Sequence, residues 1–265
     1  MRAMLPATLA LLWLTAASVS SAQPPASDLT SPHGPSAPAP DGLVGPGSAR
    51  HDNPPAGRFN WKGTLVQSGL LLATQHSLRM VQEKTRRHLG GPFWTEYVAT
   101  VRGLRGWNDD NPVITNFVGH PMMGAITGFI QIQNDPGGAA LGWQPRHPAY
   151  WKSRFKALGW AAAYSTSYEL APWGEAGIGN VGYDPGTMAY VDLVVTPLAG
   201  FGMILLEDYL DRKVIERLEQ GKNARGWRTL RVLVNPQRGI ANLLRFKRPS
   251  HRDTRPAPAG APVTS

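Results

Sequence analysis

The sequence contains no cysteine, and this absence excludes disulfides, thiolate metal ligands and a cysteine nucleophile. Charged residues are also scarce, at 17% of the chain against about 25% in an average soluble domain. Stability must therefore come from packing, and less of the surface is built to face water. This composition predicts either a compact bundle with a large interior or a protein that touches a membrane.

Signature spacings of several enzyme and metal-site classes are missing as well. No Gly-x-Ser-x-Gly nucleophile motif occurs, and no glycine-rich phosphate loop ends in Lys followed by Ser or Thr. The His-x-x-x-His and Glu-x-x-His spacings that would indicate a metal site are absent too. We therefore expect neither a metal ion nor a cofactor.

The N-terminus has the features of an export signal. Arg2 supplies the positive charge, residues 5–19 form an apolar run, and Ser20-Ser21-Ala22 offers small residues for cleavage before Gln23. The alternative is an uncleaved anchor helix, but the run is short for a bilayer span of about 20 residues. Residues 1–22 are predicted to be a cleavable signal peptide. We expect the mature protein in the periplasm or attached to an envelope membrane.

Proline, alanine and serine dominate both ends of the mature chain, so residues 23–57 and 249–265 are predicted to be disordered. Between them, residues 58–248 carry apolar residues at helical spacing and few strand-like alternations. Helices are predicted over Trp61–Leu89, Phe93–Leu104, Val113–Asn134, Tyr150–Leu170, Thr187–Gln220, Trp227–Val234 and Arg238–Phe246. We expect an all-α or mostly α fold, a compact bundle of five or six helices in which prolines break two apolar helices.

The net charge of +9 comes from the C-terminal part of the chain. Residues 211–265 contain 13 Lys or Arg and 4 Asp or Glu, which alone gives +9. Outside the cytosol, anionic lipid headgroups are a more available partner for such a segment than nucleic acid. We expect a membrane surface as partner and no nucleic acid; the alternative is a solvated basic tail. No pattern in the sequence points to a protein partner.

Two nine-residue segments resemble one another. They read Asn116-x-x-x-His120-Pro121-x-x-Gly124 and Asp192-x-x-x-Thr196-Pro197-x-x-Gly200. A proline inside a helix removes a backbone N–H and clashes with the preceding turn. Each helix must therefore kink, or a fresh helix must begin at each proline.

If fresh helices begin there, His120 and Thr196 are N-cap residues beside free N–H groups that favour anions. Should the two breaks meet in the interior, Asn116, His120, Asp192 and Thr196 would line a polar pocket for a phosphate, a carboxylate or a lipid headgroup. The alternative is that the prolines only shape helices around a core.

A catalytic interpretation uses the same residues. His120 would act as a base and Asp192 or Glu169 would orient it, in a hydrolase acting on a lipid or another envelope substrate. A buried carboxylate such as Glu169 would have a raised pKa and could exchange protons near neutral pH. These three residues are the catalytic candidates.

The two proline motifs, together with Tyr168-Glu169, Glu175 and Asn235-Pro236, resemble an uncharacterised family of bacterial exported envelope proteins. The resemblance spans Trp61–Arg248. It implies that the two motifs belong to one shared unit, and the family has no established activity to transfer. We therefore expect a non-catalytic, membrane-associated envelope domain, with the hydrolase as the alternative.

Overall fold

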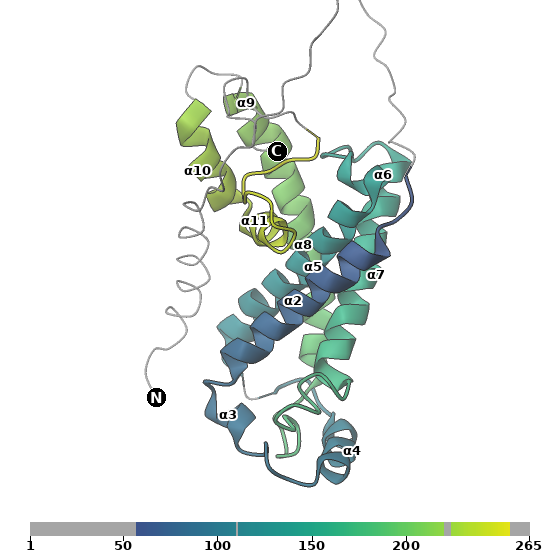
Figure 1. The fold of residues 1–265 in the computed structure, drawn as a ribbon, viewed down its shortest axis with the longest axis vertical. Helices are drawn as coiled ribbons and strands as arrows, with labels where there is room; N and C mark the ends of the chain where they lie inside the picture. Colours follow the sequence, from purple (N-terminus) through teal and green to yellow (C-terminus); the bar gives the residue numbers. More distant parts are fainter. Residues whose placement is uncertain (1–56, 110, 220–223, 255–265) are drawn as a thin grey trace, which may run out of the picture. The chain divides into compact units, whose positions relative to one another are not determined.

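The computed structural model describes residues 57–109, 111–219 and 224–254 (Figure 1). Helices and their connections make up these ranges, and no strand occurs within them. The prediction of a mostly α bundle is therefore confirmed. The predicted signal peptide, all but the last residue of the leader and residues 255–265 of the tail lie outside the described residues.

The helices follow the predicted order, but several of their ends differ from the predicted bounds and one predicted helix is broken. Their bounds are α2 Trp61–Arg79, α3 Glu83–Arg86, α4 Phe93–Gly103, η2 Thr115–Gly119, α5 His120–Asn134, α6 Pro136–Ala139, α7 Pro148–Leu170, α8 Tyr190–Leu210, η3 Asp211–Ile215, α9 Glu216–Glu219, α10 Ala224–Val234 and α11 Pro236–Leu243. A single helix over Trp61–Leu89 is wrong, because Gln82 is extended and its N–H closes a tight turn onto Arg79 O at 2.8 Å. The last helix ends at Leu243, three residues before its expected end.

Helix α5 forms the centre of the bundle, and α2, α7, α8 and α11 pack against it (Figure 1). Eleven of its fifteen residues are buried, which its lack of charged side chains allows. The core consists of Leu71, Ala125, Ile126, Phe129, Ile130, Ile132, Ala157, Ile204 and Ala241. The uncharged run seen in the sequence is thus the interior helix of the domain.

The closest approach in the bundle joins α5 and α8 at the glycines of the two proline motifs. A Cβ at Gly124 would lie 2.0 Å from the backbone oxygen of Thr196. A Cβ at Gly200 would lie 2.8 Å from the carbonyl carbon of Gly124. Only glycine permits backbones this close. The two motifs therefore cross directly.

Neither proline follows a non-helical N-cap residue. Pro197 lies inside the continuous helix α8, so Thr196 is an interior residue and not an N-cap. Ahead of α5, the chain forms the π-helical turn η2, and His120 is helical and donates its N–H to Thr115 O. The wider turn accommodates the proline that follows. Of the two alternatives that the sequence left open, the one that places N-caps and anion-binding N–H groups at His120 and Thr196 is therefore wrong.

Candidate functional site

Three helices bring His120, Glu169 and Asp192 together. His120 is the first residue of α5, Glu169 lies in the last turn of α7 and Asp192 in the first turn of α8. One ligand atom from each side chain lies within 4.8 Å of the others. Glu169 and Asp192 are both 4% exposed. All three catalytic candidates thus share one location, where the two carboxyl groups are buried and the imidazole is partly buried; we call it the His–carboxylate site.

His120 contacts two side chains of α8 through the same ring nitrogen. Its Nδ1 lies 3.4 Å from the Thr196 hydroxyl and 3.5 Å from Asp192 Oδ1. Asp192 and Thr196 are four residues apart on a helix, so they face the same side. The Asp192 contact is an electrostatic approach and not a formed hydrogen bond, because its geometry leaves Oδ1 without a hydrogen-bond partner among the described residues.

Asp109 links the fourth predicted pocket residue, Asn116, to the site. The Asn116 amide donates to Asp109 Oδ1 over 2.6 Å, and the nearby Asp109 carboxyl helps to raise the pKa of Asp192. Sequence reasoning missed Asp109 because it lies in a cluster that is typical of a turn. The only local signal is its spacing to Asn111, whose N–H donates to Asp109 Oδ1 over 3.2 Å.

Burial sets the protonation of this group. Burial and then the neighbouring Asp109 raise the pKa of Asp192 to about 8. Burial, followed by Glu175 and Asp192, raises the pKa of Glu169 well above its usual value. Burial lowers the pKa of His120, although Glu175 and Asp109 offset part of that change. Near pH 7 the imidazole is therefore neutral, and at least one carboxyl of the group holds a proton.

Two basic side chains and a fourth carboxylate complete the surroundings. Arg79 Nε pairs with Glu175 Oε1 at 2.9 Å, and Lys84 Nζ donates to Asn111 Oδ1 over 3.3 Å. Both cations favour the ionised form of Glu169. Carboxylates still outnumber these cations, so the site disfavours the phosphate or carboxylate ligands expected from the sequence.

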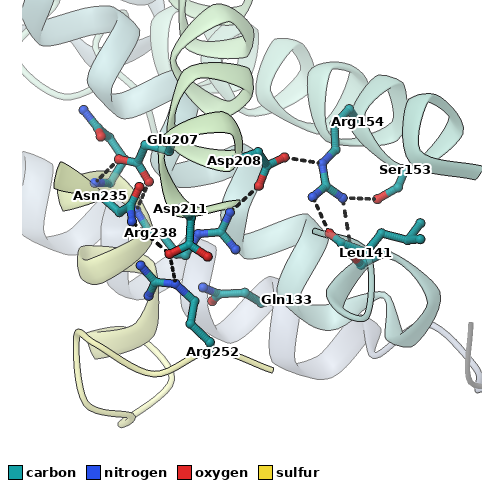
Figure 2. A network of polar contacts seen from close by, with 12 residues as sticks. Gln133, Leu141, Ser153, Arg154, Glu207, Asp208, Asp211, Asn235, Arg238 and Arg252 are labelled. Atoms are coloured by element: carbon teal, nitrogen blue, oxygen red, sulfur yellow. Dashed lines mark hydrogen bonds and ion pairs between the residues drawn. The ribbon is translucent and has the colours of Figure 1, made fainter. Parts of the chain in front are cut away.

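A second buried polar cluster surrounds the C-terminal half of α8 (Figure 2). Arg154 is fully buried; its Nε pairs with Asp208 at 2.8 Å and its Nη2 donates to Leu141 O over 2.7 Å. Arg238 pairs with the other oxygen of Asp208. Arg252 Nε pairs with Asp211 Oδ1 at 2.9 Å. We call this cluster the Arg–carboxylate network.

The C-terminal basic segment contributes to this network instead of remaining free. Arg231, Arg238, Arg245 and Arg252 all pair with carboxylates of the chain. Part of the segment that the composition assigned to the tail is packed, because the Asn242 amide donates to Pro249 O and His251 O over 3.0 and 3.1 Å. Internal pairing therefore accounts for some of the charge that the sequence assigned to a lipid surface.

Comparison of the chain with protein-family models, curated proteins and solved structures found no match in any of the three. The resemblance noted from the motifs therefore stays a prediction, and function has to be argued from the site and the surface of this molecule alone.

Proposed function

We propose that the chain is an exported protein of the cell envelope whose helical domain is a non-catalytic, membrane-associated binding domain. The export signal and the low charge content support this proposal. The observation that carries it is the inverted polarity of α8. In water, an amphipathic helix turns its apolar stripe inward and its charged residues outward.

Helix α8 has the opposite arrangement. Its three charged residues, Asp192, Glu207 and Asp208, are all buried. Its exposed apolar residues follow helical spacing along the whole element and are Tyr190, Val194, Leu198, Leu206 and Tyr209. We call this row the α8 stripe. Polar residues that face a bundle interior while apolar residues face outward are typical of helices in contact with lipid.

Helix α2 repeats the inversion. Its buried polar residues are Thr64, Gln67, Ser68, Gln75 and Arg79, whereas its exposed apolar residues are Trp61, Leu65, Val66 and Leu70. By length and composition, one helical stretch among the described residues, Tyr190–Glu219, could cross a membrane, and 39% of its apolar window is buried. Core helices of soluble proteins pass the same criterion. The inverted polarity of two helices is therefore the stronger argument.

Vesicle flotation of the purified mature protein tests membrane association. We expect the wild type to float with phosphatidylethanolamine–phosphatidylglycerol vesicles. The double variant Leu198→Asp/Leu206→Asp should bind at least ten times more weakly, because lipid contact of each leucine contributes about 1.5 kcal/mol or more. Phe246→Asp is the matched control, since Phe246 is exposed but lies outside the α8 stripe. Flotation of the double variant at wild-type level, or no flotation of the wild type, would refute the proposal.

Extraction and processing complete this test. Release by carbonate washing indicates peripheral attachment, and retention indicates embedding in the bilayer. A mature N-terminus at Gln23, measured by mass spectrometry of protein from cells, would support export. An N-terminus at Met1 would contradict it.

A hydrolase acting on a lipid or another envelope substrate is the second candidate, and the convergence of His120, Asp192 and Glu169 favours it. The hydroxyl of Thr196 is an unsuitable nucleophile, because it and Asp192 approach the same nitrogen of His120. His120 would have to activate a water through Nε2. Phospholipid hydrolysis that is lost in His120→Ala and kept in His251→Ala would establish this function in place of the non-catalytic one.

A further inference from the structure

The two buried polar clusters of α8 differ in their charge balance. In the Arg–carboxylate network, three carboxylates (Glu207, Asp208 and Asp211) face three arginines (Arg154, Arg238 and Arg252). At the His–carboxylate site, four carboxylates (Asp109, Glu169, Glu175 and Asp192) face two cations among the described residues, Arg79 and Lys84. The first cluster is neutral when ionised. The second would carry about two excess negative charges if all four carboxyls were ionised, which is costly in a buried setting unless protons or a further cation are bound.

Buried oxygen atoms without hydrogen-bond partners indicate where a cation could bind at this site. Glu169 Oε1, Asp192 Oδ1 and Asn116 Oδ1 are buried and have no hydrogen-bond partner among the described residues. Each is an oxygen that can accept a hydrogen bond or ligate a cation, and the carboxyl oxygens could donate only when protonated. Buried acceptors of native proteins normally have hydrogen-bond partners. Three buried acceptors without a partner near one histidine therefore indicate a ligand. A cation bound by Glu169 Oε1 and Asp192 Oδ1 would satisfy these two oxygens and offset the excess charge together.

We infer that His120, Glu169 and Asp192, whose ligand atoms lie within 4.8 Å of one another, bind one divalent first-row transition-metal ion. One imidazole nitrogen with carboxylate oxygens suits Zn²⁺, Mn²⁺ or Fe²⁺ better than Mg²⁺ or Ca²⁺, which prefer oxygen alone. The three ligands come from three helices, so no local spacing in the sequence could reveal them. The ion would also tie the ends of α5, α7 and α8 together.

Metal titration of the full mature protein tests the inference. The protein is stripped with EDTA and dialysed, then titrated with Zn²⁺ by calorimetry and with Mn²⁺ by electron paramagnetic resonance. We expect one ion per chain with a micromolar or lower Kd, and a higher Tm when the ion is bound. Asp192→Asn should weaken binding at least ten-fold, because it removes a ligand charge but keeps the shape of the side chain.

His251→Ala is the matched control, because His251 and Asp253 form another histidine–carboxylate pair, with 3.2 Å between Nε2 and Oδ1. This variant should bind metal like the wild type. Glu169→Gln provides a second ligand variant if Asp192→Asn fails to fold. No binding below about 1 mM, unchanged binding in the ligand variants, or an equal loss in His251→Ala would each overturn the inference. Because binding is measured without vesicles, its outcome is separate from that of flotation.

Discussion

The crossing of α5 and α8 gives a graded prediction from three glycines. Gly124, Gly200 and Gly202 all lie in helices, but a Cβ would meet different surroundings at each. The nearest non-neighbouring heavy atom would be 2.0 Å away at Gly124 and 2.8 Å away at Gly200, with nothing within 4 Å at Gly202. Alanine at the three positions therefore separates crowding from helix propensity.

The magnitudes follow from these distances. A Cβ essentially never lies within 3.0 Å of a non-neighbouring atom, so Gly124→Ala must move the two backbones apart by about 1 Å. Such overpacking costs about 2 to 4 kcal/mol, and the better helix propensity of alanine returns up to about 1 kcal/mol. We expect a net loss of about 1 to 3 kcal/mol for Gly124→Ala. Gly200→Ala should lose less, and Gly202→Ala should gain about 0.5 to 1 kcal/mol.

Urea unfolding of the purified protein, followed by circular dichroism, measures these differences. A change of 1 kcal/mol corresponds to about 2 to 4 °C in Tm for a domain of this size. The order of stability should be Gly202→Ala, wild type, Gly200→Ala, Gly124→Ala. Equal stability of Gly124→Ala and Gly202→Ala would show that the helices do not cross this closely, and it would remove the basis for placing His120 beside Thr196.

Two further predictions concern the Arg–carboxylate network. Burial, partly opposed by Arg238, raises the pKa of Glu207 from 4.5 to about 7, so the folded chain holds a proton that the unfolded chain releases. This proton contributes about 3 kcal/mol to the free energy of unfolding below pH 4.5, and the contribution is lost as the pH rises to about 7. Glu207→Gln should remove this pH dependence when unfolding is measured by urea titration. Arg154→Lys should lower the free energy of unfolding by about 2 to 3 kcal/mol, because lysine cannot reach Asp208 and Leu141 O together. The control Lys156→Arg, on the exposed side of α7, should be neutral within about 0.5 kcal/mol. Equal Tm values of the two variants would contradict this reasoning.

Helix positions could be predicted because each rests on a local pattern. The apolar run over Val113–Asn134 contains the central helix α5. Gly90-Gly91-Pro92 separates α3 from α4, as expected of glycines and a proline that end a helix. Whether the two proline motifs meet was left open by the sequence, and the structure brings them together at Gly124 and Gly200. The local sequence could not decide whether each proline would start a new helix. Before Pro121, the π-helical turn η2 accommodates the proline and leads directly into α5.

The membership of the two polar clusters could not be predicted in the same way. Glu169 and Asp192 lie on different helices, and Arg154 pairs with Asp208 across a separation of 54 residues. Such pairings depend on how the helices pack, and no periodic pattern in the sequence indicates them. Asp109 was hidden by its turn-like neighbours, and the C-terminal arginines were counted as surface charge because composition carries no information about partners.

The charge balance of the two clusters predicts that Asp→Asn substitutions at two positions of α8 change the free energy of unfolding in different ways. Asp208→Asn leaves Arg154 and Arg238 facing no carboxylate at that position and should cost about 3 to 5 kcal/mol. Asp192→Asn replaces a carboxyl whose ionisation is disfavoured by burial and by Asp109, so it should leave the metal-free protein as stable as the wild type or more stable. Both residues are buried, so solvent exposure cannot explain a difference. Urea unfolding in EDTA compares them, and an equally large loss in Asp192→Asn would mean that the His–carboxylate site is a structural network without excess charge.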